Sequence, residues 1–168
     1  RYQELRRKWA PNVNWSFFVF FTFQALTNVL LALPVYIITA NTTPKLSVLE
    51  YIGLVIWIIG ISGESIADRQ LKKFKANPAN KGKVCDVGLW NYSRHPNYFF
   101  EWSIWVAYFV FALASPWGFT VVICPAIMLY FLLKVTGIPM TEEQSIRSRG
   151  DAYREYQRTT SMFVPWFK

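Results

Sequence analysis

The sequence predicts an all-α fold, a polytopic membrane helical bundle of about four transmembrane helices with short cytoplasmic helices. Three observations support this prediction. Of the 168 residues, 53% are hydrophobic, and they fall into long runs instead of the shorter patterns of a soluble core. Short polar turns separate these runs. The positive charges, which give a formal net charge of +8, cluster beside the runs and mostly on one side of the membrane.

The first apolar run covers residues 15–40. It is long enough to cross a hydrocarbon core of about 30 Å with some tilt. Gln24, Thr27 and Asn28 have the spacing i, i+3, i+4 and so share one helix face. Because polar groups in lipid need partners, we expect this face to point into the bundle. Pro34 is expected to kink the helix.

The second apolar run, about residues 46–67, follows a short turn and ends in an acidic stripe. Glu64, Asp68 and Lys72 have the spacing i, i+4, i+8. One interpretation is a helix that emerges into water with ordinary salt bridges. The other is an acidic stripe at the mouth of a polar cavity, since acidic groups at membrane depth usually mark function. A basic connector over residues 69–94 comes next.

The third apolar run, residues 99–136, is too long for one transmembrane helix. A straight helix of this length would measure roughly 57 Å, about twice the hydrocarbon thickness. Turn formers at 115–118 divide the run. We therefore expect a helical hairpin with helices at about 97–114 and 117–136.

The distribution of charge predicts the orientation in the membrane. When the four helices are threaded in order, 17 of the 18 Lys and Arg residues fall on one side. The positive-inside rule then places both ends of the chain and residues 69–98 in the cytoplasm, with the polar tail 137–168 forming short helices there. This predicts a multi-pass protein of the bacterial inner membrane or the endoplasmic reticulum. Topology explains the positive charge, so membrane lipids are expected as partners and nucleic acid is not.

The most polar stretch, residues 88–101, contains the only histidine. Its proline predicts a helix start, and cationic groups at a helix start favour a bound anion. Arg94 and His95 suit phosphates. Asn97 and Glu101 are four residues apart on one helix face and suit ribose hydroxyls or a carboxamide. The stretch therefore predicts a site for a large polar cofactor at the cytoplasmic face.

Several other kinds of site are not predicted. The sequence has no paired metal-ligand motif, no Ser-His-Asp pattern and no Gly-x-Gly-x-x-Gly turn, so any nucleotide would be held without a Rossmann turn. Cys85 and Cys124 lack metal-ligand spacing and are interpreted as two unpaired thiols.

Four segments carry a resemblance to a known family: 67–70, 88–101, 137–143 and 153–167. Together they resemble the steroid 5-alpha-reductase-like membrane family, which comprises 3-oxo-5-alpha-steroid 4-dehydrogenases and sterol reductases, and in particular its bacterial-type branch. The resemblance implies that residues 1–168 form a single transmembrane domain, the C-terminal part of that fold, and belong to a longer chain. It also implies an oxidoreductase that uses NADPH to reduce a carbon–carbon double bond conjugated to a ketone in a lipid-like or steroid-like substrate.

The same resemblance assigns residues to the cofactor. Asp68, Asn97 and Glu101 match the family's cofactor-contacting Asp and its Asn-Tyr-Phe-x-Glu motif, while Arg94 and His95 match an Arg-His-Pro variant. The family's catalytic residues lie on helices that precede this part, so the catalytic group is not assigned; Gln24 and Glu64 are the nearest polar candidates. The expected cofactor-binding residues are Asp68, Arg94, His95, Asn97, Tyr98, Glu101 and Tyr156.

Two alternatives stay open. The chain also resembles the isoprenylcysteine carboxyl methyltransferases, which use S-adenosylmethionine. The resemblance lies in Arg-His-Pro-x-Tyr, a later Glu-Glu and then Tyr-x-x-Tyr. The chain departs from that family's pattern at two places. It has Phe100-Glu101 where the family tends to have Gly, and its ending at 159–167 differs. The other alternative is a non-enzymatic, lipid-binding membrane protein, but a site without chemistry would not need so many polar residues.

Overall fold

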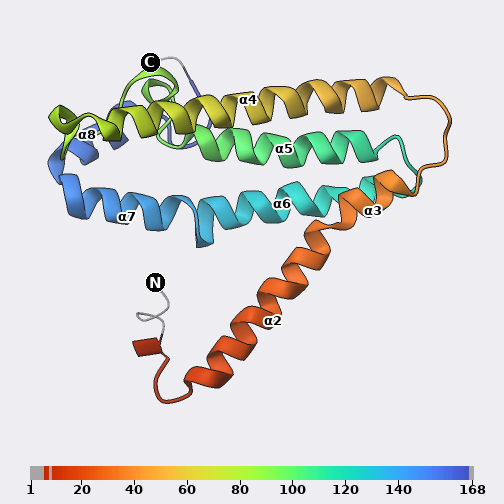
Figure 1. Cartoon of the computed structure of the whole chain (residues 1–168), viewed down its shortest axis with the longest axis horizontal. Helices are drawn as coiled ribbons and strands as arrows, with labels where there is room; N and C mark the ends of the chain where they lie inside the picture. The colour runs from red at the N-terminus through yellow and green to blue at the C-terminus, as the bar shows by residue number, and fades with distance from the viewer. Residues whose placement is uncertain (1–5, 8, 167–168) are drawn as a thin grey trace.

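The computed structural model describes residues 6–7 and 9–166, which form an elongated bundle of helices (Figure 1). The predicted all-α membrane bundle is confirmed: apart from an isolated bridge between Ser93 and Ser161, the described residues contain no strand pairing. The helices are α2 (Val13–Leu31), α3 (Leu33–Thr39), α4 (Val48–Ala76), α5 (Pro96–Ala112), α6 (Ile123–Tyr130), α7 (Ile138–Arg149) and α8 (Asp151–Thr159). Short 3-10 turns lie at Pro78–Asn80, Gly88–Asn91 and Gly118–Val122.

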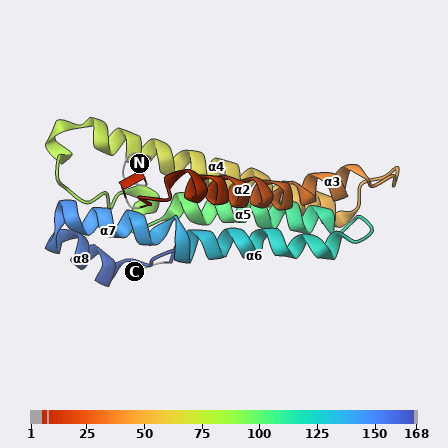
Figure 2. The ribbon, with the colours of Figure 1, turned by 90° about the horizontal axis from the view of Figure 1, so that it is seen from below.

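The centre of the bundle is the antiparallel pair α4 and α5, which lie side by side in both views (Figures 1 and 2). Small residues let the two backbones approach closely. At Gly63, a Cβ atom would lie 2.4 Å from the ring of Phe100, and at Gly60 it would lie 2.8 Å from Ile104. The glycines therefore determine which face of α4 packs against α5.

Helix α4 is longer than its apolar run. It begins with a capping box, in which the Ser47 hydroxyl accepts from the Glu50 N–H and the Glu50 carboxylate accepts from the Ser47 N–H. It continues to Ala76, so the prediction that residues 69–94 form one connecting loop is wrong for the first part of that segment. Nothing breaks the helix before Pro78, because the basic residues after position 67 are good helix formers.

The first apolar run bends where the proline predicted it. Helix α2 ends at Leu31, Ala32 intervenes, and α3 starts just before the buried Pro34. Figure 1 shows α3 along the bundle and α2 directed away from it. The prediction that the polar face of α2 points into the bundle is wrong: α2 has no buried residue, and Gln24 and Asn28 are exposed. The bend is the physical reason, since it turns α2 away from its neighbours.

The predicted hairpin is confirmed, with its turn at Ser115–Gly118. Trp117 adopts a left-handed conformation with φ of 62°, and Gly118 sits so close to the end of α5 that a Cβ atom would lie 1.7 Å from the Ala112 carbonyl oxygen. The returning arm is less regular than predicted, because a π-helical turn at Phe131–Val135 separates α6 from α7.

Among the described residues, three helical segments are long and apolar enough to cross a membrane: Val13–Thr39, Val48–Ala76 and Gly118–Arg149. The prediction was about four spanning helices. Helix α5, the fourth, has only 17 residues and so is at the short end of the length needed to cross a membrane. The charged segments that follow α3 lie at the same end of the bundle: the end of α4, the segment before α5, and helices α7 and α8 (Figures 1 and 2). The start of α2 lies away from the bundle (Figure 1). The charges of the α4 end, of the segment before α5 and of α7 and α8 are therefore close together, whereas the prediction about the side of the membrane stays a prediction.

Candidate functional site

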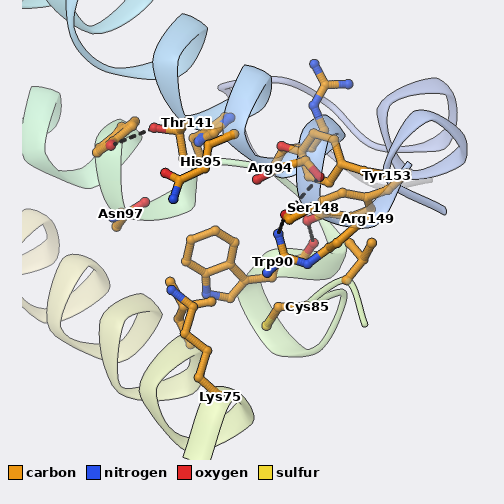
Figure 3. Close-up of a pocket in the computed structure, with 16 residues that line it drawn as sticks. Lys75, Cys85, Trp90, Arg94, His95, Asn97, Thr141, Ser148, Arg149 and Tyr153 are labelled. Carbon is orange, nitrogen blue, oxygen red and sulfur yellow. Dashed lines mark hydrogen bonds between the residues drawn. The ribbon is translucent and has the colours of Figure 1, made fainter. Parts of the chain in front are cut away.

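A cavity of about 350 Å³ lies at the charged end of the bundle. Its walls come from the end of α4, the segment before α5, the first turn of α5, and helices α7 and α8 (Figure 3). Five of the seven predicted cofactor residues line it: Arg94, His95, Asn97, Tyr98 and Tyr156. The structure therefore brings the two sequence motifs, 88–101 and the C-terminal tail, into one site.

The other two predicted residues lie elsewhere. Asp68 is exposed on α4 and is not among the residues that line this cavity. Glu101 lines a separate cavity, one turn further along α5. Glu64 and Asp68 both repel the Glu101 carboxylate electrostatically, so the three acidic groups gather where α4 meets α5. Neither Glu64 nor Asp68 lines any of the three described cavities, so their interpretation as part of a polar cavity mouth stays a prediction.

Arg94 is the centre of a buried hydrogen-bond network. Its Nε donates to Glu142 Oε1 at 2.8 Å, and its Nη1 donates to the backbone carbonyls of Gln157 and Thr160. Glu142 also accepts, through Oε2, from the side chain of Gln157 at 2.8 Å. The guanidinium thus ties α5 to α7 and α8 and faces the cavity with much of its donor capacity already used.

His95 is held between an acidic and an aromatic neighbour. Its Nε2 lies 3.2 Å from Glu142 Oε1, and its ring stacks on Tyr98 with centroids 5.4 Å apart and an interplanar angle of 4°. The Tyr98 hydroxyl lies 3.3 Å from Thr141 Oγ1. Thr141 donates its own proton to the Gly137 carbonyl at 2.7 Å, so Tyr98 is the donor in their contact.

The side-chain oxygen of Asn97 indicates what kind of ligand the site could bind. Its Oδ1 is buried and has no hydrogen-bond partner among the described residues. Buried amide oxygens are nearly always paired, and an unpaired acceptor is unfavourable by about 1–3 kcal/mol. An acceptor in this position at the cavity wall is suited to a ligand that donates an N–H or O–H group.

Tyr156 shapes the cavity wall through its hydroxyl, which donates to the backbone carbonyls of Trp90 and Ser93. Trp90 in turn donates from its indole Nε1 to the Ala67 carbonyl on α4 at 2.9 Å. Burial raises the pKa of Tyr156 well above its usual value, and burial together with Glu142 raises the pKa of Tyr153 to about 12. Both tyrosines are therefore neutral at physiological pH.

The sequence analysis missed two cationic lining residues, Lys75 and Arg149. Arg149 Nε donates to the Lys83 carbonyl at 2.8 Å, which holds the end of α7 against the segment before α5. None of the 16 lining residues is acidic. Cys85 also lines the cavity, and burial is the main reason that the pKa of its thiol is raised. The basic run at the end of α4 could have indicated Lys75 as a lining residue. No feature of the sequence distinguishes Arg149 from its neighbours.

Comparison with known proteins connects this site to a family. A family model described as "Protein of unknown function (DUF1295)" matches residues 1–160. A protein of Ustilaginoidea virens, "Probable O-methyltransferase ustE", is 42% identical over 53 residues, which cover 32% of this chain and 18% of that relative. No solved structure matches the chain. The family is associated with reductases and methyltransferases. The chain belongs to the DUF1295 family, which includes steroid 5-alpha-reductase-like membrane proteins.

Proposed function

We propose that this protein is a membrane-embedded reductase that binds NADPH in the cavity at the charged end and reduces a carbon–carbon double bond in a lipid-like enone. The main support for this proposal is the positive charge of the residues that line the cavity. Lys75, Arg94 and Arg149 line it, and no lining residue is acidic. NADPH is strongly anionic, whereas the sulfonium, ammonium and carboxylate groups of S-adenosylmethionine leave it with a net positive charge, which a cationic cavity favours less.

The residues of the cavity fit the parts of such a cofactor. Asn97 Oδ1, which lacks a partner, suits the N–H of the nicotinamide carboxamide. Lys75 and Arg149 suit the phosphates, while Arg94 holds the wall in place through Glu142. When bound, NADPH supplies a hydride to the β-carbon of the enone and leaves as NADP⁺, and an acid supplies a proton to the α-carbon.

A second candidate function is an S-adenosylmethionine-dependent methyltransferase. The similarity to the Ustilaginoidea virens protein favours it. So does the cavity volume of about 350 Å³, which is near the lower end for ligand cavities and suits a mononucleoside better than a dinucleotide. The two functions therefore differ in which ligand stabilises the folded protein.

Thermal unfolding of the purified protein in detergent separates the two. NADPH is expected to raise the melting temperature and S-adenosylmethionine is not, because a ligand that binds only the folded state stabilises it in proportion to its affinity. Arg149→Gln should weaken NADPH binding about tenfold, and Asn97→Ala should weaken it similarly. Arg147→Gln is the matched control, since Arg147 is on the same helix and pairs with Glu143 in solvent. Stabilisation by S-adenosylmethionine alone would refute the reductase.

Activity provides the second arm of the test. Oxidation of NADPH by the protein in lipid vesicles should require an added steroid enone and should slow in Arg149→Gln in parallel with the loss of binding. If neither cofactor stabilises the protein and no enone is consumed, the third interpretation, a lipid-binding protein without catalysis, is the correct one.

A further inference from the structure

A second cavity, of about 310 Å³, lies within the membrane-spanning part of the bundle. One wall comes from the α2–α3 bend and the other from α5, and its lining is apolar except for one carboxyl group, one phenol and one indole. Among its lining residues are Pro34, Val35, Glu101, Ile104, Trp105 and Tyr108.

Helix α5 contributes residues to both this cavity and the cofactor cavity. Asn97 lines the cofactor cavity, and Glu101, four residues later on the same helix face, lines the second one. Four residues of helix correspond to about 6 Å along the axis. The polar end of the membrane cavity is therefore about one helical turn along α5 from Asn97, whose side-chain oxygen is suited to the nicotinamide.

The apolar space continues beyond Tyr108. A third cavity, of about 240 Å³, lies between α3, α4 and α5, and Tyr108 lines both it and the second cavity. The indole N–H of Trp57 points to the Tyr108 hydroxyl at 3.4 Å, so this phenol has a partner inside the protein. From Glu101 to Phe111, at the far end of the third cavity, α5 covers about 15 Å. An elongated apolar body with its polar group at one end matches this shape.

We propose that the cavity between α3 and α5 binds the lipid-like substrate, and that Glu101 contacts the polar group of this substrate instead of the cofactor. This inference rests on the proposed function. A carboxyl group in an apolar cavity needs a hydrogen-bond partner, and a ketone or hydroxyl at one end of a lipid provides it. Contact with Glu101 places the reacting end of the substrate next to Asn97, and the rest of its body points along α3 towards the far side of the membrane.

The position of Val35 offers a direct way to fill this cavity. Val35 lines the cavity, is 57% exposed and does not belong to a packed core, so a larger side chain can be accommodated without disturbing the fold. Leu31 lines the same wall on α2 and provides an independent position. Ile59 is the matched control: it is an apolar residue on the exposed face of α4 and lines none of the three cavities.

The test uses the full chain in lipid vesicles and a diazirine-bearing 4-ene-3-ketosteroid as photolabel, with labelled residues identified by mass spectrometry. Labels are expected on α3 and α5. Val35→Trp and Leu31→Trp should each lower labelling about tenfold, and Ile59→Trp should leave it unchanged. Labelling that spreads over the lipid-facing residues and ignores both tryptophans would overturn the proposal. So would equal labelling of the cavity by a diazirine-bearing fatty acid, which would assign the cavity to membrane lipid.

Variants of Glu101 separate this proposal from the proposed function. Glu101→Leu should reduce labelling by the steroid, Glu101→Gln should retain it, and both should keep the stabilisation by NADPH. Loss of NADPH stabilisation with intact labelling would return Glu101 to the cofactor and overturn the inference. If NADPH fails to stabilise the wild-type protein while the steroid still labels the cavity, the reductase function is refuted and the lipid site stands.

Discussion

Replacing Glu142 by Leu removes the acceptor that joins Arg94, His95 and Gln157. The side chains of Arg94 and Glu142 are only 9% and 14% exposed, so the loss leaves a guanidinium in a poorly solvated place. Removing one partner of such a pair typically destabilises a protein by about 3–5 kcal/mol. We expect the lower value, about 3 kcal/mol, because Arg94 still donates to two backbone carbonyls.

Thermal unfolding in detergent, followed by circular dichroism, measures this effect. For a chain of this size, 1 kcal/mol shifts the melting temperature by about 2–4 °C, so Glu142→Leu should lower it by about 6–12 °C. Glu143→Leu is the control. Glu143 pairs with Arg147 in solvent, with side chains 64% and 75% exposed, and such pairs contribute at most about 1 kcal/mol.

A double variant tests the cause of the destabilisation. Arg94→Met together with Glu142→Leu should be less destabilised than the sum of the single variants, because no unpaired charge is left behind. If Glu142→Leu lowers the melting temperature no more than Glu143→Leu does, or if the double variant shows simple additivity, then the buried network does not hold α5 against α7 and α8.

Three further predictions concern packing, ionisation and topology. Gly63→Ala should destabilise the protein by about 1–3 kcal/mol in the same assay, because the added methyl group meets the Phe100 ring between α4 and α5. Since burial raises the pKa of Tyr153 to about 12, the stability that this neutral phenol contributes is present below pH 10 and is lost as the pH rises towards 12. Tyr153→Phe should therefore lessen the fall in melting temperature over that range, and the fall that remains comes from Tyr156, whose pKa is also raised by burial. In intact bacteria, a membrane-impermeant maleimide should label Thr43→Cys, and should label Lys81→Cys only after lysis, with little background because both native thiols are buried.

Each of these has a contradicting result. An unchanged melting temperature in Gly63→Ala would mean that α4 and α5 are not in close contact there. An equal loss of stability between pH 10 and 12 in the wild-type protein and in Tyr153→Phe would show that another group titrates. Labelling of Lys81→Cys in intact cells would reverse the orientation in the membrane.

The secondary structure of this protein follows closely from local sequence. The apolar runs became α2 to α6, the turn at 115–118 lies where its proline and glycine predicted it, and the bend near Pro34 is present. Helix α4 ended later than predicted, because the end of an apolar run marks where a helix leaves the membrane, whereas the helix itself ends at the first breaker. The position of α2 was predicted incorrectly, because a polar face indicates a need for partners but not the direction in which a bend turns the helix.

The composition of the cavity at the charged end depended on tertiary structure. Arg94 pairs with Glu142, 48 residues away, and that pairing cannot be read from either motif. Lys75 and Arg149 reach the same cavity from helices α4 and α7, and only the packing of these helices brings their side chains to one wall. Asn97 and Glu101 share a helix face, as their spacing predicts, yet the neighbouring helices divide that face between two cavities.

The sequence by itself determined that this chain forms membrane-spanning helices, that its charges gather at one end, and that the polar stretch 88–101 lies there. These properties depend on hydrophobicity, helix breakers and charge, which act over a few residues or along one helix. The tertiary structure decided which polar groups are used in holding the helices together, which acceptor is left without a partner, and which cavity each residue lines. Those properties depend on contacts between helices that are distant in sequence, where small residues and bends set the distance and direction of approach.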